Sequence, residues 1–301
     1  MVNNKTWKLG GSLEINRFGY GAMRITGEGI IGAPKDEAEA IRVLRKAVEM
    51  GVNFIDTADS YGPYISEELI AKALYPYPKD LVIATKGGQL RPGPDQWVPD
   101  GQPIHIKEAL EGSLKRLKTD RIDLYQLHRR DMNVPFEDTL GVLKEAQDKG
   151  LIRYFGLSEL DVESVRQAQK YIDVVSLQNK FSLDYRKWEP ELKFCAENNI
   201  AFIPWNPLNA GRLVVNETIE RIANKYKITK PQLSLKWLFN YSNNILLIPG
   251  TSKVSHLEEN LAVRDMEFDP ADFEAITKAS LEIPKKARSP RKPYFAERQA
   301  R

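Results

Sequence analysis

Short apolar runs alternate along the chain with longer segments in which apolar residues recur every three or four positions. Eight of the short runs are rich in Val, Ile, Leu, Phe or Tyr, the composition of strands that are buried on both faces. They are residues 18–23, 52–58, 81–86, 121–128, 154–158, 174–181, 200–205 and 244–250. Strands that alternate with helices predict parallel β-α-β units.

The longer segments predict helices that cover the sheet. Residues 36–50, 105–118 and 135–149 each place apolar side chains on one helical face. Gly51 and Gly150 follow two of these segments at the position of a C-cap.

Two architectures fit this alternation, an open doubly wound sheet and a closed barrel. Eight runs in 301 residues favour an α/β fold of the (β/α)8 TIM-barrel type, formed by residues 1–301 as a single domain. Residues 6–21 predict an N-terminal hairpin that turns at Gly10 and Gly11, and extra helices are expected towards the C-terminus. Residues 18–23 match a dinucleotide-binding glycine motif only weakly, so a Rossmann site is not supported.

Composition narrows the class of protein further. Hydrophobic residues make up 42% and charged residues 28% of the chain, and no apolar run reaches the roughly 18 residues of a membrane span. The N-terminus lacks the apolar core of a signal peptide, and the one cysteine, Cys195, cannot form an intramolecular disulfide. We therefore expect a cytoplasmic protein without a membrane partner.

The net charge of +3 is unevenly distributed. Residues 283–301 carry seven Lys or Arg and one Glu, so the rest of the chain has a net charge of −3. The basic character belongs to the tail, and it does not indicate a nucleic-acid partner.

Polar residues stand where the apolar runs end. The second run ends in Asp56, with Tyr61 in the loop beyond it, the third ends in Lys86 and the fourth in His128. Because the active site of a parallel barrel lies at the carboxyl ends of its strands, these four side chains are candidates for one site.

The next three runs end in the same way. Ser158 ends the fifth run, Gln178 lies in the sixth, and Trp205 and Asn206 end the seventh. In a closed barrel all of these residues would surround the same mouth.

The four candidates together suit proton donation to a carbonyl oxygen. A tyrosine has a pKa near about 10, and a neighbouring lysine ammonium lowers it, while an aspartate keeps the lysine charged and oriented. A histidine can hydrogen-bond the reacting oxygen. Singly, each residue has an ordinary explanation as a turn, packing, solvated or core residue. Their order on successive strands favours an active site, and no histidine pair has the spacing of metal ligands, so no metal is expected.

Several stretches resemble the aldo-keto reductase family, in the family's order and over nearly the whole chain. They are "GVNFIDTADSYG", "IATKGG", "RIDLYQLH", "FGLSE", "LQNKFSL", "PWNPL" and "IPGTS". The resemblance implies a barrel that reduces the carbonyl group of a small molecule with NADPH, giving NADP+. It implies that Tyr61 donates the proton, that Lys86 held by Asp56 lowers the pKa of Tyr61, and that His128 orients the substrate oxygen.

The resemblance also implies residues that bind the cofactor. They are Ser158, Gln178, Trp205, Asn206, Leu208, Arg212, Gly250, Thr251, Ser252, Lys253, Glu259 and Asn260. Lys253 is the candidate for a 2′-phosphate. The chain departs from the family at Glu159, where many members have Asn, and at His256, where an arginine is common.

A narrower resemblance, carried by "GAMR", "GAPKD" and "GPDQW", is to bacterial pyridoxal reductases (pyridoxine 4-dehydrogenases) within the family. Two other functions stay open. The barrel could be a cofactor-sensing regulatory binding protein, or an aldolase or isomerase with Lys86 as a Schiff base. The four candidate residues favour the reductase.

Overall fold

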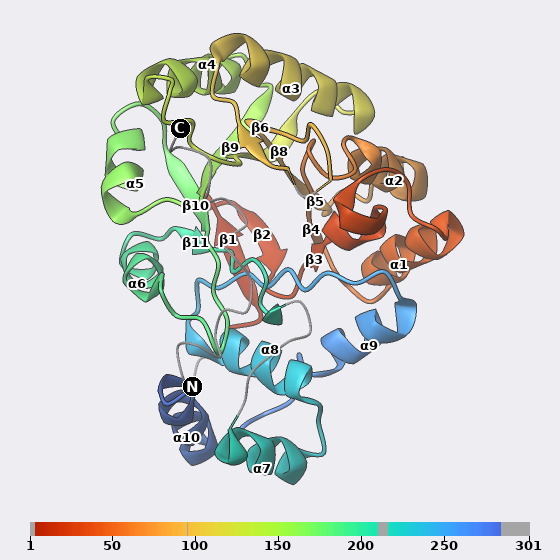
Figure 1. The fold of residues 1–301 in the computed structure, drawn as a ribbon, viewed down its shortest axis with the longest axis vertical. Helices are drawn as coiled ribbons and strands as arrows, with labels where there is room; N and C mark the ends of the chain where they lie inside the picture. The colour runs from red at the N-terminus through yellow and green to blue at the C-terminus, as the bar shows by residue number, and fades with distance from the viewer. Residues whose placement is uncertain (1–3, 95, 210–215, 284–301) are drawn as a thin grey trace.

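A parallel sheet curls through the centre of the computed structural model, which describes residues 4–94, 96–209 and 216–283 (Figure 1). Within these residues the sheet has seven strands in the order β11-β10-β9-β8-β5-β4-β3. They are β3 (Tyr20–Gly21), β4 (Phe54–Asp56), β5 (Val82–Gly87), β8 (Ile122–Leu127), β9 (Ile152–Ser158), β10 (Val174–Gln178) and β11 (Ala201–Phe202). Each corresponds to one of the predicted apolar runs.

The eighth predicted strand, residues 244–250, does not form a regular strand. Single parallel bridges join Ile245 to Phe202 and Leu247 to Phe18, so this segment lies between the two edges of the sheet and closes the barrel. Pro249 follows shortly after the bridged residues and has no N–H to donate, which limits the ladder on this side.

Glycines allow the closing segment to approach the first strand. A Cβ atom on Gly21 would lie 2.6 Å from the carbonyl oxygen of Ile248, and one on Gly250 would lie 2.7 Å from the carbonyl oxygen of Gly21. The G-x-G spacing of the first run therefore serves barrel closure and not a Rossmann-type turn.

Helices cover the outside of the barrel, as the alternation predicts. They are α1 (Glu37–Glu49), α2 (Ile65–Leu74), α3 (Pro103–Arg116), α4 (Phe136–Asp148), α5 (Val162–Ala168), α6 (Glu189–Glu197), α7 (Glu217–Tyr226), α8 (Lys230–Tyr241), α9 (Val254–Ala262) and α10 (Pro270–Leu281). The three helices expected from residues 36–50, 105–118 and 135–149 are α1, α3 and α4, with ends that differ by one or two residues.

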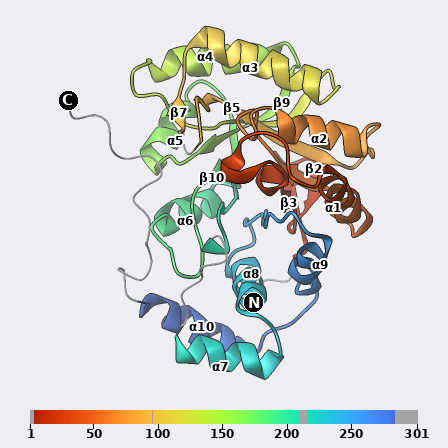
Figure 2. The same cartoon turned by 45° about the vertical axis from the view of Figure 1, so that its right-hand side comes forward.

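Two of these helices, α7 and α10, are additional to the barrel repeat and lie side by side (Figures 1 and 2). Tyr226 at the end of α7 packs on Phe268 with ring centroids 4.9 Å apart, and Lys225 pairs with Asp272 of α10 at 2.6 Å. Only α10 follows the barrel, because α7 is inserted between β11 and α8. Both α7 and α10 lie in the last third of the chain, towards the C-terminus as expected.

The predicted hairpin consists of β1 (Thr6–Leu9) and β2 (Leu13–Asn16), which pair antiparallel. Gly10 and Gly11 have φ angles of 54° and 76°, a left-handed conformation that glycine adopts readily, and with Ser12 they form the three-residue turn between the paired Leu9 and Leu13. The hairpin buries Leu9 and Ile15 in one cluster with residues of the barrel strands, among them Phe54. It therefore contributes to the apolar interior of the barrel.

A short antiparallel arm lies between β5 and α3, formed by β6 (Gln89–Leu90) and β7 (Val98–Pro99). The Arg91 guanidinium lies 3.6 Å above the ring of Trp97 and donates to the carbonyl of Gly29 at 2.8 Å. The arm is thereby joined to the loop that precedes α1. Among the described residues, no helix has the length and apolar character needed to cross a membrane.

Arg17 joins the hairpin to the other end of the chain. Its fully buried guanidinium donates to the carbonyls of Asn4, Phe239, Ser242 and Ile245 at 2.6–3.0 Å. Burial lowers its pKa to about 10, which still leaves it charged at neutral pH. Four carbonyls, two of them in buried bonds, from the N-terminus, the C-terminal end of α8 and the closing segment thus accept from one side chain.

Replacing Arg17 by alanine should destabilise the barrel by about 3 kcal/mol or more, because it leaves buried carbonyls without a donor. Arg17→Lys should be intermediate, since an ammonium supplies fewer donors in a different geometry. The free energy of unfolding is measured in urea by circular dichroism. The exposed Arg121→Ala is the control and should change it by less than about 0.5 kcal/mol. An Arg17→Ala protein as stable as this control would contradict the role assigned to Arg17.

Candidate active site

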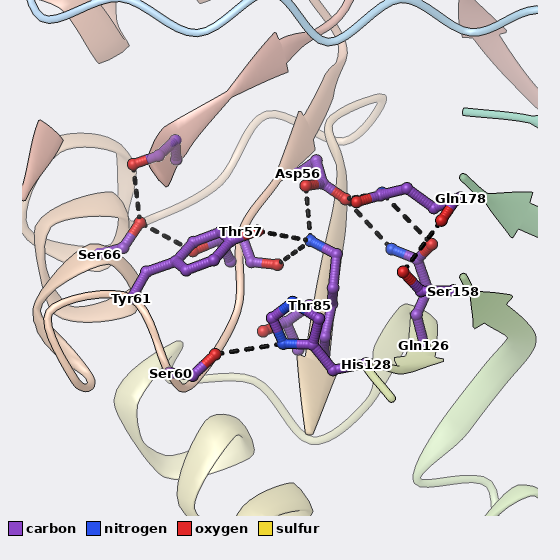
Figure 3. A network of polar contacts seen from close by, with 12 residues as sticks. Asp56, Thr57, Ser60, Tyr61, Ser66, Thr85, Gln126, His128, Ser158 and Gln178 are labelled. Atoms are coloured by element: carbon purple, nitrogen blue, oxygen red, sulfur yellow. Dashed lines mark hydrogen bonds and ion pairs between the residues drawn. The ribbon is translucent and has the colours of Figure 1, made fainter. Parts of the chain in front are cut away.

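The carboxyl ends of five neighbouring strands bring their polar side chains to one mouth of the barrel (Figure 3). Asp56 ends β4, Lys86 lies near the end of β5, and His128 directly follows β8. Ser158 and Gln178 end β9 and β10. Because successive parallel strands present their ends at the same edge, residues far apart in the sequence meet here, as the strand-end pattern predicts.

A buried ion pair forms the centre of the site. Lys86 Nζ lies 2.6 Å from Asp56 Oδ1 and donates to the carbonyl of Thr57 at 2.7 Å. The two side chains are 0% and 3% exposed. The other carboxylate oxygen, Oδ2, accepts from the side-chain amides of Gln126 at 3.1 Å and Gln178 at 2.8 Å. Both charges are therefore compensated inside the barrel.

This environment keeps the lysine protonated. Burial lowers the pKa of Lys86, but the Asp56 carboxylate and the Tyr61 oxygen outweigh it, and the pKa is raised above its ordinary value. Nucleophilic amine chemistry needs the opposite shift. The geometry therefore disfavours the Schiff-base alternative.

Tyr61 reaches the ion pair from the loop after β4. Its hydroxyl lies 3.4 Å from Lys86 Nζ, a long hydrogen bond, and its side chain packs with Ile30, Ala58 and Trp97. The loop is tied to β5, because the Asp59 N–H donates to the Lys86 carbonyl at 3.1 Å. The five-residue step from Asp56 to Tyr61 thus places the phenol over the lysine.

The net pKa shift of Tyr61 differs from the expectation. Burial raises the pKa of the phenol, and although Lys86 acts to lower it, the pKa is raised overall. Lys86 lowers the pKa of Tyr61 as expected, but desolvation, which the prediction did not include, exceeds the effect of the ammonium. Tyr61 consequently carries its proton at neutral pH and can donate it.

His128 stands beside Tyr61 as a neutral imidazole. Burial lowers its pKa well below the ordinary value, and the nearby charges of Arg129, Lys86 and Arg91 act in the same direction. Its backbone N–H donates to the Gly87 carbonyl at 2.8 Å. The ring meets Tyr61 edge-on at a centroid distance of 5.8 Å. A neutral imidazole can offer one N–H to a ligand in the mouth.

Two residues predicted to bind a cofactor lie next to this group. The Ser158 hydroxyl donates to the Gln178 carbonyl at 2.9 Å and accepts from Arg129 at 2.8 Å. The Gln178 amide is directed at Asp56, as described above. The structure therefore brings Ser158 and Gln178 together with the four catalytic candidates, and Gln178 also supports the ion pair.

Trp205, also predicted to bind the cofactor, is half-buried near the end of β11 and is held by Glu159. Its indole N–H donates to Glu159 Oε1 at 2.6 Å, and the same oxygen accepts from the backbone N–H of Lys180 at 2.6 Å. Glu159 has a φ angle of 55°, a conformation in which Asn is commoner than Glu. The departure from the family pattern thus supplies an acceptor that orients the indole.

The remaining candidates lie on loops and at α9. Asn206 and Leu208 follow Trp205, and Arg212 lies outside the described residues. Gly250, Thr251, Ser252 and Lys253 connect the closing segment to α9, where Ser252 and Lys253 are exposed. The Thr251 carbonyl accepts from the Tyr20 hydroxyl at 2.6 Å.

Glu259 and Asn260 lie in the second half of α9, with Glu259 exposed and Asn260 buried. The first turn of α9 has an unexpected partner. The backbone N–H of Val254 donates to Glu39 Oε1 of α1 at 3.0 Å, and this bond is the main cause that lowers the pKa of Glu39. A carboxylate therefore already lies at the helix N-terminus, and the charge of Lys253 also contributes to the lowered pKa of Glu39.

Several residues that support the site are not among those predicted from the sequence. Gln126 supports Asp56, Thr57 supports Lys86 through its carbonyl, and Ser60 bonds His128. Gln126 could have been found, because it precedes His128 by two residues on a strand and so points to the same side. Among the described residues, no group of three or more His, Cys, Asp or Glu side chains could hold a metal ion.

Residues 17–281 match the model of the Aldo/keto reductase family. The chain is 45% identical over 264 residues to an uncharacterized oxidoreductase of Schizosaccharomyces pombe, covering 87% of this chain and 86% of that protein. It is 38% identical over 273 residues to pyridoxine 4-dehydrogenase of Escherichia coli, covering 89% of this chain and 95% of that protein.

Solved structures are similar as well. An aldo/keto reductase of Klebsiella pneumoniae, crystallised with NADP and acetate, superimposes with a TM-score of 0.77 at 26% identity, covering 91% of this chain and 95% of that chain. The family match over residues 17–281 and the structural superposition over 91% of the chain therefore both include most of the barrel.

Proposed function

The chain belongs to the aldo/keto reductase family, and we propose that it reduces an aldehyde or ketone to an alcohol with NADPH, using Tyr61 as proton donor. The observation that carries the proposal is the buried Asp56–Lys86 pair with the Tyr61 hydroxyl 3.4 Å from its ammonium. A charged lysine, a protonated phenol and a neutral imidazole in one mouth are suited to protonating a carbonyl oxygen.

The residues of the chain fit a dinucleotide along one rim of the barrel. The half-buried indole of Trp205 can stack on a flat ring, and Ser158 and Gln178 supply hydroxyl and amide groups beside it. Lys253, the N-cap residue of α9, can add positive charge for a phosphate beside the helix N-terminus, where Glu39 accepts the N–H of Val254. When bound, the reduced nicotinamide would supply the hydride.

The chain's own residues would then manage the proton and the oxygen. Tyr61 would donate its proton to the oxygen as negative charge develops there, and Lys86 would stabilise the phenolate that remains. Asp56, fixed by Gln126 and Gln178, would keep Lys86 charged and in place. His128 would hydrogen-bond the same oxygen and set its direction.

Pyridoxal is the first substrate to examine. The chain is 38% identical to the Escherichia coli pyridoxine 4-dehydrogenase over 89% of its own length. The purified protein should oxidise NADPH when it is given an aldehyde substrate. The reaction is monitored as the loss of NADPH absorbance, with a panel of aldehydes that includes pyridoxal. Failure on every aldehyde and ketone, with NADPH still bound, would favour the cofactor-sensing alternative.

Tyr61→Phe should lose a factor of about 10² to 10⁴ in carbonyl turnover, because the proton donor is removed while the ring is kept. The affinity for NADPH, measured by the quenching of protein fluorescence, should change little. Tyr77→Phe is the matched control, since its hydroxyl bonds the Leu117 carbonyl away from the site. If Tyr61→Phe turns over like this control, Tyr61 is not the proton donor.

The preference for NADPH should depend on two opposite charges at α9. Lys253→Ala should weaken NADPH binding about two- to fivefold more than NADH binding, because a positive charge beside the 2′-phosphate is lost. Glu39→Gln should shift the ratio the other way, since it removes a negative charge but keeps an oxygen that can accept from Val254. Dissociation constants for both cofactors are measured by calorimetry. Equal ratios in all three proteins would exclude both residues from phosphate discrimination.

A further inference from the structure

Ser60 makes a hydrogen bond that the proposed roles of the four catalytic candidates do not use. Its hydroxyl oxygen lies 3.1 Å from His128 Nδ1 (Figure 3). The two residues are 3% and 5% exposed, so solvent does not compete strongly for this bond. Ser60 directly precedes Tyr61 in the loop after β4.

The direction of this bond follows from the balance of donors and acceptors. In a neutral imidazole one ring nitrogen donates and the other accepts. The Ser60 hydroxyl has no other hydrogen-bond partner among the described residues, so its proton needs an acceptor, and Nδ1 is the one available. If Nδ1 carried the proton instead, the buried hydroxyl proton would be left without a partner.

The rest of the environment restricts the orientation of the His128 ring. The backbone N–H of His128 is bound to the Gly87 carbonyl on β5. The ring edges of Tyr61 and Trp97 contact it at centroid distances of 5.8 and 6.3 Å. Packing of this kind limits the ring, and the bond to Ser60 distinguishes its two nitrogens.

We propose that Ser60 is a positioning residue of the carbonyl site, which donates to His128 Nδ1 and so presents the Nε2–H to the substrate oxygen. The role of the Nε2–H towards a substrate rests on the proposed reductase function. The protonation state of the imidazole does not depend on that function and can be observed in the free protein.

This arrangement links the two groups that would contact the substrate oxygen. Ser60 and Tyr61 lie in one turn, closed by a hydrogen bond from the Tyr61 N–H to the Ala58 carbonyl at 3.2 Å. The turn that carries the proton donor therefore also orients the histidine. A shift of this loop would disturb both groups together, whereas loss of the Ser60 hydroxyl would disturb His128 alone.

The state of His128 can be read by nitrogen-15 NMR of the histidine-labelled protein, since the chain has three histidines and His128→Gln identifies the relevant signals. We expect a protonated Nε2 and an unprotonated Nδ1 that is shifted by accepting a hydrogen bond. In Ser60→Ala the Nδ1 signal should move towards that of a free acceptor. Ser66→Ala, which removes a buried hydroxyl bonded to Thr57 and Ala22, should leave it in place.

Kinetics provide the second test. Ser60→Ala should lower kcat/KM for the carbonyl substrate about tenfold, as expected for the loss of one orienting hydrogen bond, with NADPH affinity unchanged. Ser60→Thr, which keeps a hydroxyl, should restore most of the loss. A protonated Nδ1 in the wild-type protein would overturn the proposal, as would unchanged His128 signals in Ser60→Ala. If the NMR result holds but no carbonyl is reduced, the proposed function fails and the hydrogen-bond assignment stands.

Discussion

The ion pair between Asp56 and Lys86 is the interaction on which the rest of the site depends. Burying two charges is costly unless they are paired and hydrogen-bonded, and this pair meets both conditions. The carboxylate uses its second oxygen for Gln126 and Gln178, and the ammonium uses its other protons for Thr57 and Tyr61. The contributing residues come from β4, β5, β8, β10 and the loop after β4, so the pair exists only when these strands are in register.

Closure of the barrel provides that register. The edge strands β3 and β11 do not meet directly but are joined through single bridges of the segment at residues 245–247. Glycines permit the close approach of the closing segment to β3, and Arg17, which precedes β3, binds carbonyls from three parts of the chain. A short, irregular seam is sufficient because the hairpin contributes to the apolar interior beneath it.

The sequence predicted the barrel and the meeting of Asp56, Tyr61, Lys86 and His128, because strand periodicity and the carboxyl-end rule depend on local pattern. It did not predict that the eighth strand is irregular, since an apolar run does not show how many of its residues will hydrogen-bond to the neighbouring strands. The net pKa shift of Tyr61 was also out of reach, because it depends on how completely the neighbouring loops bury the phenol. Glu159 departs from the family pattern, and only the fold brings its carboxylate to the Trp205 indole. Contacts between loops follow from three-dimensional packing, which periodicity does not encode.

The raised pKa of Tyr61 determines which side chain of the site can donate a proton at neutral pH. A phenol that ionised readily at neutral pH would lose its proton before a substrate arrived, whereas burial keeps the proton on Tyr61. The Lys86 ammonium opposes burial, and its attraction is strongest for the phenolate, so it acts mainly once the proton has left. Burial, assisted by the nearby cations, lowers the pKa of His128 and keeps the imidazole neutral, so a second acidic proton does not compete with that of Tyr61. Burial thus keeps one proton on Tyr61, the Lys86 ammonium would stabilise the anion formed when that proton leaves, and burial together with the nearby cations leaves His128 a hydrogen-bonding role.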